Sequence, residues 1–361
     1  MGKHFKTTEN QLAFPVLALI LALVSVAAVQ SYVQYHDVLY QDSGHPKLRE
    51  FNISKWEYSL FSEETKLVSP INPPSLHIDR DYPRLDGAKA MIPIYAAAAN
   101  AIYRKSEKQD GGRDVDLRKT AVEFSMAELF AYKELLDGKV DMIFALAPSE
   151  EQKTEAAEKG ITYTLTPIAK EAFVFLVNEQ NPVANLSIEQ IRDIYSGKIN
   201  NWRKVGGTPG KIIAFQRDKY SDSQAAMVLN VMHETKMRRP IEEENRDQEY
   251  NTLIRSVAEY RNLKNAIGYS FRYSATAMNS VSGIRLLAVD GVAPTTENIR
   301  NGSYPFTEDY YIVTARPLSE NTSKLRDWFL SDEGQQFISE VGYVPIRNYS
   351  SCMTQYRSYC R

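Results

Sequence analysis

From residue 82 onward, short apolar runs alternate with stretches that have helical periodicity. Apolar runs of this length are typical of buried strands, and their regular alternation with helices predicts an α/β sheet protein. We expect strands at residues 121–124, 140–145, 172–177, 212–215, 266–270 and 310–314. We expect helices at residues 90–104, 126–136, 188–195, 223–233 and 324–330.

The length and composition are those of an ordinary globular protein. The chain has 361 residues, of which 43% are hydrophobic and 24% are charged. This leaves room for two domains of about 100 to 150 residues each. The formal net charge of -2 gives no indication of a nucleic-acid partner, which usually requires a basic surface.

An apolar run near the N-terminus predicts export. Residues 12–29 carry no formal charge and would span about 27 Å as a helix, close to the thickness of a bilayer's hydrocarbon core. Lysines precede the run and aspartates follow it, so the positive-inside rule leaves residues 1–11 in the cytoplasm. We expect a single-pass anchor at 12–31 with the rest of the chain outside the cell membrane. A cleaved signal peptide is the alternative, since Val26, Ala27 and Ala28 are small enough for a cleavage site.

The segments that flank the α/β region are irregular. Residues 32–78 contain closely spaced prolines and are interpreted as a stalk. Within it we expect a short element that docks on the main body, formed by Trp56, Tyr58, Leu60 and Phe61. The only cysteines, Cys352 and Cys360, lie in the C-terminal tail at 348–361. In an oxidising compartment they can form a disulfide, and the alternative is two unpaired thiols.

The segment from Arg217 to Gln224 has the pattern of an oxyanion site. Arg217 precedes Ser221, and Ser221 with Gln224 has the spacing of a capping box at the start of a helix. Helix N-termini attract anions, and an arginine fork adds charge-assisted hydrogen bonds. Asp222 opposes this, because a carboxylate repels an anion. The same capping-box spacing begins at Ser125, Ser149 and Ser187.

The residue types needed for catalysis or metal binding do not occur at suitable spacing. The five histidines are scattered, and there is no Gly-x-Ser-x-Gly nucleophile motif. We therefore expect no enzyme activity, no catalytic residue, no metal and no cofactor.

Several motifs occur in one order along the chain, and together they resemble a known family. They are YPRLDG at 82–87, NPVANLSIEQ at 181–190, IYSGKINNW at 194–202 followed by Gly206 and Gly207, Arg217-x3-Ser221, AIGY at 266–269, GQ at 334–335 and GYVP at 342–345. Over residues 82–347 the chain resembles the phosphate-binding components of bacterial ABC transporters, in the type 2 periplasmic-binding-protein superfamily.

This resemblance implies two α/β lobes joined by two crossover strands. Lobe 1 would contain residues 79–167 and 281–347, lobe 2 would contain residues 168–280, and the crossovers would be 172–177 and 266–270. Lobes of this kind close on a ligand and present a shape that ABC permease subunits can distinguish. The implied partners are inorganic phosphate or a related oxyanion and a permease.

The resemblance also implies ligand-binding residues. Arg217 matches the arginine that pairs with the anion, while Ser221 and Ser223 match two hydroxyl positions. Asp141 matches a carboxylate that accepts a proton from phosphate, and Ser125 approximately matches a serine after the second strand.

The departures from the family pattern concern the same site. Asp86 and Gly87 are followed by Ala88, Lys89, Ala90 and Met91, so three hydroxyls common in relatives are missing, and Asp222 replaces a glycine. We expect Lys89, Met91 and Asp222, which stand at these changed positions, to contact the ligand as well. A carboxylate within about 4 Å of an anion costs roughly 4 kcal/mol at an effective dielectric of 20, although Lys89 can compensate as a new cation. Two functions therefore remain: an oxyanion receptor for a transporter, and a sensor or interaction protein that has lost phosphate affinity.

Overall fold

The computed structural model describes residues 60–349, except 63–64, 106–108, 111–112, 115–116, 126–127, 218–221, 240–256, 258–262 and 279–281. The side chain of Asp222 also lies outside this description. The expected cytoplasmic tail, the membrane segment at 12–31 and both cysteines fall outside it as well, so these expectations stay predictions. Across the part of the chain that is described, no helix has the length and apolar character of a membrane span.

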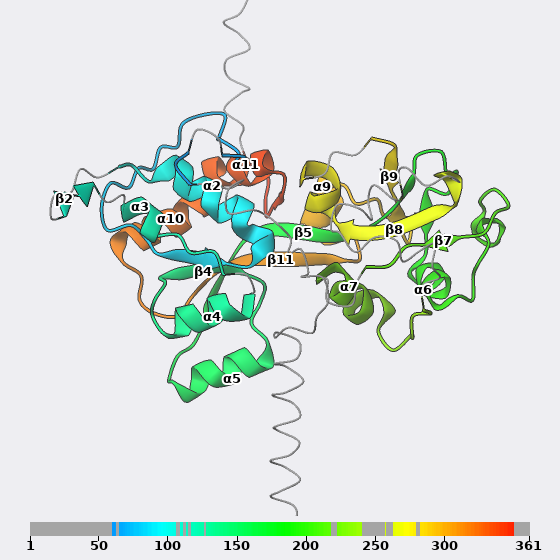
Figure 1. Cartoon of the computed structure of the whole chain (residues 1–361), viewed down its shortest axis with the longest axis horizontal. Coiled ribbons are helices and arrows are strands. Elements are labelled where there is room, and N and C mark those ends of the chain that lie inside the picture. Colours follow the sequence, from blue (N-terminus) through cyan, green and yellow to red (C-terminus); the bar gives the residue numbers. More distant parts are fainter. Residues whose placement is uncertain are drawn as a thin grey trace, which may run out of the picture. The chain divides into compact units, whose positions relative to one another are not determined.

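The centre of the structure is an eight-stranded mixed sheet (Figure 1). Its strands follow the order β1-β4-β11-β5-β8-β7, and β9 and β12 also pair with β5. Their bounds are β1 Leu85–Gly87, β4 Met142–Ala145, β5 Thr164–Asn178, β7 Ile213–Ala214, β8 Ala266–Phe271, β9 Ile284–Leu286, β11 Thr307–Thr314 and β12 Val344–Pro345. Two small ladders join β6 Asn185–Leu186 to β10 Ala288–Val289 and β2 Gln109–Asp110 to β3 Arg113–Asp114.

The long strand β5 runs through two parts of the sheet. Residues 164–172 pair with β11, and residues 173–177 pair with β8. Separate groups of buried apolar side chains lie on either side of this change of partner, and they define lobe 1 and lobe 2. The α/β fold class predicted from the alternating pattern is confirmed.

Helices cover the sheet in both lobes. In lobe 1, Figure 1 shows α2, α10 and α11 on one side of the sheet and α4 and α5 on the other, while α9 and α6 lie on opposite sides in lobe 2. Their bounds are α2 Ile92–Ile102, α3 Leu117–Thr120, α4 Glu128–Leu136, α5 Glu150–Glu158, α6 Ile188–Ser196, α7 Asp222–Ala226, α9 Thr296–Arg300, α10 Glu320–Leu330 and α11 Asp332–Val341. Short turns of other helix types are η1 Lys89–Met91, η2 Trp202–Val205, η3 Met227–Met232, η5 Leu263–Asn265 and η6 Ser274–Met278.

Two of the four predicted capping boxes are present in full. Ser149 caps α5 and Ser187 caps α6, and in each case the side-chain oxygen of the glutamine three residues later accepts a hydrogen bond from the backbone N–H of the serine. Ser221 lies outside the described residues, so its cap stays a prediction.

The structure corrects the expected lobe boundary at residue 281. Leu287, Val289, Ile299 and Tyr304 are buried in the apolar core of lobe 2, so this lobe extends to about residue 306. The chain therefore returns to lobe 1 through β11, whereas β8, which was expected to be a crossover, pairs only with strands of lobe 2.

Three local expectations also change. The strand expected at 121–124 is reduced to a single bridge between Val122 and Leu85, and the helix expected at 223–233 divides into α7 and the π-helical turn η3. The part of the expected stalk from residue 60 packs on lobe 1, where Leu60, Leu67 and Ile78 are buried in its core.

Candidate ligand-binding site

The first half of the candidate site is the loop between β1 and α2 in lobe 1. Ala88 N–H donates to the carbonyl oxygen of Phe144 on β4 at 2.7 Å. A Cβ atom at Gly87 would lie 2.5 Å from that oxygen, so only glycine allows the two strands to approach so closely. The turn η1 then carries Lys89 to the start of α2.

Asp86 organises this loop from within the protein. Its side chain is fully buried, and Oδ1 accepts hydrogen bonds from the backbone N–H groups of Gly87 and Ser125, both at 2.8 Å. Ser125 Oγ donates to Oδ2 at 2.5 Å. Burial raises the pKa of Asp86, while the hydrogen bonds from Ser125 and Gly87 oppose that rise.

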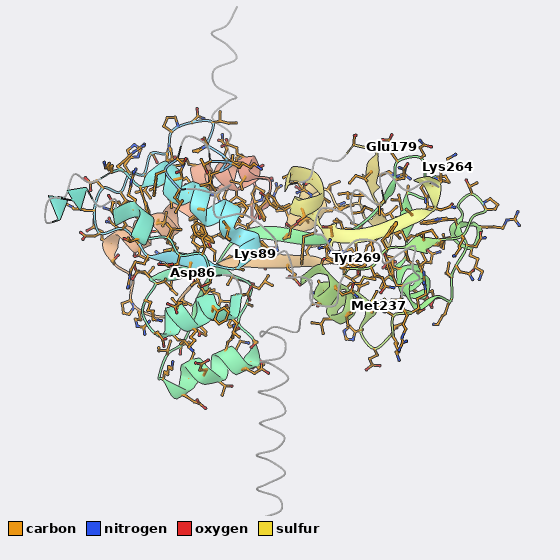
Figure 2. All side chains as sticks on the ribbon, viewed as in Figure 1. Asp86, Lys89, Glu179, Met237, Lys264 and Tyr269 are labelled. Carbon is orange, nitrogen blue, oxygen red and sulfur yellow. The ribbon has the colours of Figure 1, made fainter. Side chains whose placement is uncertain are left out.

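The two candidates that follow Asp86 differ in exposure. Lys89 is half-buried, and Figure 2 shows it on the lobe 2 side of Asp86, with Tyr269 across from it in lobe 2. Met91 is fully buried in the apolar core of lobe 1. The expectation that Met91 contacts a ligand is therefore corrected, since its side chain packs away from solvent.

The second half of the site follows β7 in lobe 2. The Arg217 N–H donates to Gln224 Oε1 and to the hydroxyl oxygen of Tyr269, both at 3.1 Å. The Tyr269 hydroxyl donates in turn to Gln224 Oε1, and the Gln224 amide donates to Met237 Sδ at 3.5 Å. Tyr269 and Gln224 are both buried, so the backbone of Arg217 is held by groups that are themselves fixed. Sequence reasoning placed Arg217 here but missed Tyr269.

The start of α7 lies directly after this arginine. The helix begins at Asp222, and Ser223 in its first turn is buried. Ser221 and the Asp222 side chain are outside the described residues, so their roles as ligand contacts stay predictions.

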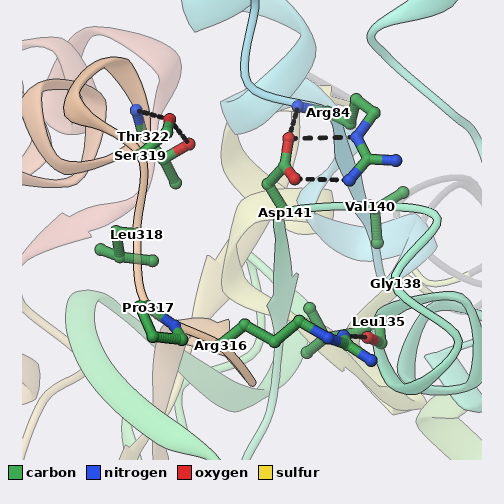
Figure 3. A pocket seen from close by; sticks show the side chains of 10 residues that line it. All are labelled: Arg84, Leu135, Gly138, Val140, Asp141, Arg316, Pro317, Leu318, Ser319 and Thr322. Atoms are coloured by element: carbon green, nitrogen blue, oxygen red, sulfur yellow. Dashed lines mark hydrogen bonds and ion pairs between the residues drawn. The ribbon is translucent and has the colours of Figure 1, made fainter.

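Asp141 lies away from both halves. Asp141 and Arg84 precede β4 and β1, which are parallel, so both residues mark the amino ends of these strands. Arg84 donates to Asp141 through its backbone N–H at 2.7 Å, through Nε at 3.2 Å and through its terminal nitrogen at 2.6 Å (Figure 3). Ligands in open α/β sheets bind at the carboxyl ends of strands. Its position therefore does not support Asp141 as the carboxylate that accepts a proton from phosphate.

A cavity of about 110 Å³ opens beside this ion pair. Arg316 crosses its wall and donates to the carbonyl oxygens of Leu135 and Leu136 at the end of α4, both at 2.6 Å (Figure 3). These bonds satisfy free carbonyls at the helix terminus. The arginines of this cavity thus have partners within the protein, and all the residues that line the cavity belong to lobe 1.

Groups of acidic, histidine or cysteine side chains that could hold a metal ion are not present among the described residues.

Two lobes that share one mixed sheet are the architecture of bilobal binding proteins. The model of the PBP superfamily domain matches residues 130–340, and the chain belongs to this superfamily.

The chain is similar in sequence to phosphate-binding proteins of bacteria over most of their length. The chain is 26% identical over 220 residues to the phosphate-binding protein PstS of Borreliella burgdorferi, covering 59% of this chain and 76% of the relative. It is 24% identical over 273 residues to PstS of Bacillus subtilis, covering 73% and 80%. These relatives are named as binding proteins.

Solved structures show the same architecture. An ABC-type phosphate transport receptor from Vibrio cholerae superposes with a TM-score of 0.53 at 19% identity, over 72% of this chain and 98% of that one. A putative phosphate ABC transporter substrate-binding protein from Clostridium perfringens, with bound phosphate, superposes with a TM-score of 0.51 at 23% identity, over 73% and 98%. At this identity the superpositions establish the fold alone.

Proposed function

We propose that this protein is an extracytoplasmic solute-binding protein that captures phosphate or a related oxyanion for an ABC transporter. The observation that carries the proposal is the position of Arg217, which follows the carboxyl end of β7 and has its backbone fixed by Tyr269 and Gln224. The names of the PstS relatives support phosphate as the ligand class.

The proposed ligand lies between the two halves of the site. From lobe 2, Arg217 supplies charge and Ser221 and Ser223 supply hydroxyls, with Asp222 beside them. From lobe 1, Lys89 adds a second cation. Ser125 is the candidate hydroxyl and backbone N–H donor of this lobe, and both of these donors are bonded to Asp86. Paired charge-assisted hydrogen bonds from a guanidinium are well suited to the oxygens of phosphate.

Residues 12–31 anchor the protein to the membrane in this proposal, and ABC permease subunits receive the solute from the closed lobes. The apolar length of the segment and the charges that flank it support the anchor. Membrane fractions washed at alkaline pH provide the test. A full-length band in the pellet is expected, while a shortened chain in the supernatant indicates cleavage as a signal peptide.

A second candidate function is that of a sensor or interaction protein with little affinity for phosphate. The lobe 1 half of the site favours it, because Met91 is buried in the core and both donors of Ser125 are already engaged with Asp86.

Titration calorimetry on the full chain in detergent separates these candidates. We expect phosphate to bind with micromolar affinity and to bind more tightly than sulfate, phosphonates or small carboxylates. Arg217→Ala should abolish binding, whereas Arg326→Ala, which removes an arginine paired with Asp327 on the surface of α10, should not. Absence of binding across the whole panel would reject the receptor and favour the sensor.

A further inference from the structure

A carboxylate of the chain itself already occupies the hydrogen-bond donors of Ser125. Asp86 accepts both the Ser125 N–H and the Ser125 hydroxyl, across 39 residues of sequence. A hydroxyl has one proton to donate, so the Ser125 hydroxyl cannot donate to Asp86 and to a bound oxyanion at the same time. Resemblance to the family assigns that same serine to the ligand.

We propose that Asp86 is an internal competitor that determines the anion affinity of the site, because its carboxylate holds the Ser125 donors that an oxyanion needs. This inference rests on the proposed function. It assigns to Asp86 control of the affinity for anions, a role that was expected of none of the predicted ligand residues.

The Asp86 carboxylate and a bound oxyanion compete on similar terms, because both accept hydrogen bonds through negatively charged oxygens. Asp86 Oδ1 has two backbone N–H donors and Oδ2 has the hydroxyl, as an oxyanion in a binding loop would have. A ligand that recruits Ser125 must displace the Asp86 carboxylate or wait for it to become protonated. Dianions meet an additional electrostatic penalty, because the buried carboxylate has the same sign of charge.

The charged groups near Asp86 act in opposite directions on its proton. Glu134 on α4 adds repulsion that favours protonation, whereas the Tyr95 hydroxyl on α2 is neutral and donates to the backbone oxygen of Glu123 at 3.2 Å. Lys89, in the turn that follows, is the nearby cation in sequence. Burial raises the pKa of Asp86, so a fall in pH protonates it at a milder pH than an exposed aspartate. Protonated Asp86 accepts less strongly and releases Ser125.

The first test is a double-mutant cycle for phosphate binding by the full chain. Asp86→Asn keeps an acceptor for the Gly87 and Ser125 N–H groups, but its amide donates to Ser125 Oγ and frees the hydroxyl proton. We expect at least tenfold tighter binding in Asp86→Asn, and we expect Ser125→Ala to remove that gain. The matched control is Asp332→Asn, a surface carboxylate paired with Arg347, which should leave the affinity unchanged.

The outcomes of this cycle are distinct. A gain that persists in the Ser125→Ala background means that Asp86 acts only through its charge, and the competition is then rejected. If the native chain binds phosphate and Asp86→Asn binds it with no higher affinity, the competition is rejected and the proposed function stands. Failure of both the native chain and Asp86→Asn to bind rejects the two together.

Sulfate provides a second measurement, because its own charge does not change in the range where a carboxyl group titrates. We expect sulfate affinity of the native chain to rise as the pH falls through the pKa of Asp86, and we expect Asp86→Asn to lose that dependence. The same pH profile in both proteins would overturn the inference.

Discussion

A buried glutamate at the junction of the two lobes predicts a stability that depends on pH. Glu171 lies in β5 directly before Ala172, the last residue paired with β11, and two residues before Phe173, the first residue paired with β8. Its carboxylate accepts hydrogen bonds from Ala172 N–H at 2.7 Å and from Tyr273 N–H at 3.2 Å, and its side chain is 3% exposed. Burial raises the pKa of Glu171 to about 7, while the backbone hydrogen bonds and the charge of Arg272 oppose that rise.

The size of the effect follows from the difference between the folded and unfolded states. The carboxyl of Glu171 has a pKa of about 7 in the folded state and roughly 4.3 in the unfolded chain, so folding is favoured while the group is protonated. About 4 kcal/mol of this stabilisation is lost once the group is ionised in both states. The contribution is complete below the unfolded pKa and disappears as the pH rises through 7.

Glu171→Gln removes the charge and keeps an acceptor at the position of Oε1, which receives the Ala172 N–H. We expect the advantage of the variant over the native chain in free energy of unfolding to be about 3 kcal/mol larger at about pH 8 than at about pH 5. Urea denaturation at the two pH values measures this difference. Glu158→Gln, an exposed position at the end of α5, is the matched control.

The prediction is tested by how the stability difference between Glu171→Gln and the native chain changes between the two pH values. If Glu171→Gln is destabilised equally at both, the carboxylate is needed for its hydrogen bonds and its buried charge does not oppose folding.

The candidate site gives three further predictions. Gly87→Ala should lower the free energy of unfolding by at least 2 kcal/mol, roughly the cost of overpacking, because the new methyl group would meet the Phe144 oxygen at 2.5 Å; an unchanged melting temperature would contradict this close approach. Tyr269→Phe should weaken oxyanion binding several-fold and leave the helical circular dichroism intact, since the hydroxyl fixes the backbone of Arg217; equal affinity would remove Tyr269 from the site. Asp222→Gly should strengthen phosphate binding in calorimetry by removing a like charge, and weaker binding would identify Asp222 as a ligand contact.

Much of the fold could be predicted from local pattern. Short apolar runs gave the strands β4, β8 and β11 to within a few residues, because buried strands have a composition that does not depend on distant partners. The capping boxes at Ser149 and Ser187 are equally local, since all the groups involved lie within one helical turn.

The lobe boundary could not be predicted in the same way. Residues 284–304 follow β8 and precede β11, and their pattern is compatible with packing on either lobe. The pairing of β9 with Leu176 to Asn178 of β5 assigns them to lobe 2, and this is a contact between residues more than 100 positions apart. Strand pairing at this separation leaves no trace in the periodicity of either segment.

In the candidate site, too, local features could be predicted from the sequence and long-range contacts could not. Arg217 could be found because its chemistry and the following helix start occupy one short segment. The role of Asp86 could not be found, because it depends on Ser125, which a different loop brings to the same end of the sheet. The sequence therefore predicted Asp222, in lobe 2, as the carboxylate that opposes anion binding. The structure adds an opposing carboxylate in lobe 1, buried and bonded to the donor that the ligand would use, so oxyanion affinity should depend on the protonation of Asp86 as well as on the charge at Asp222.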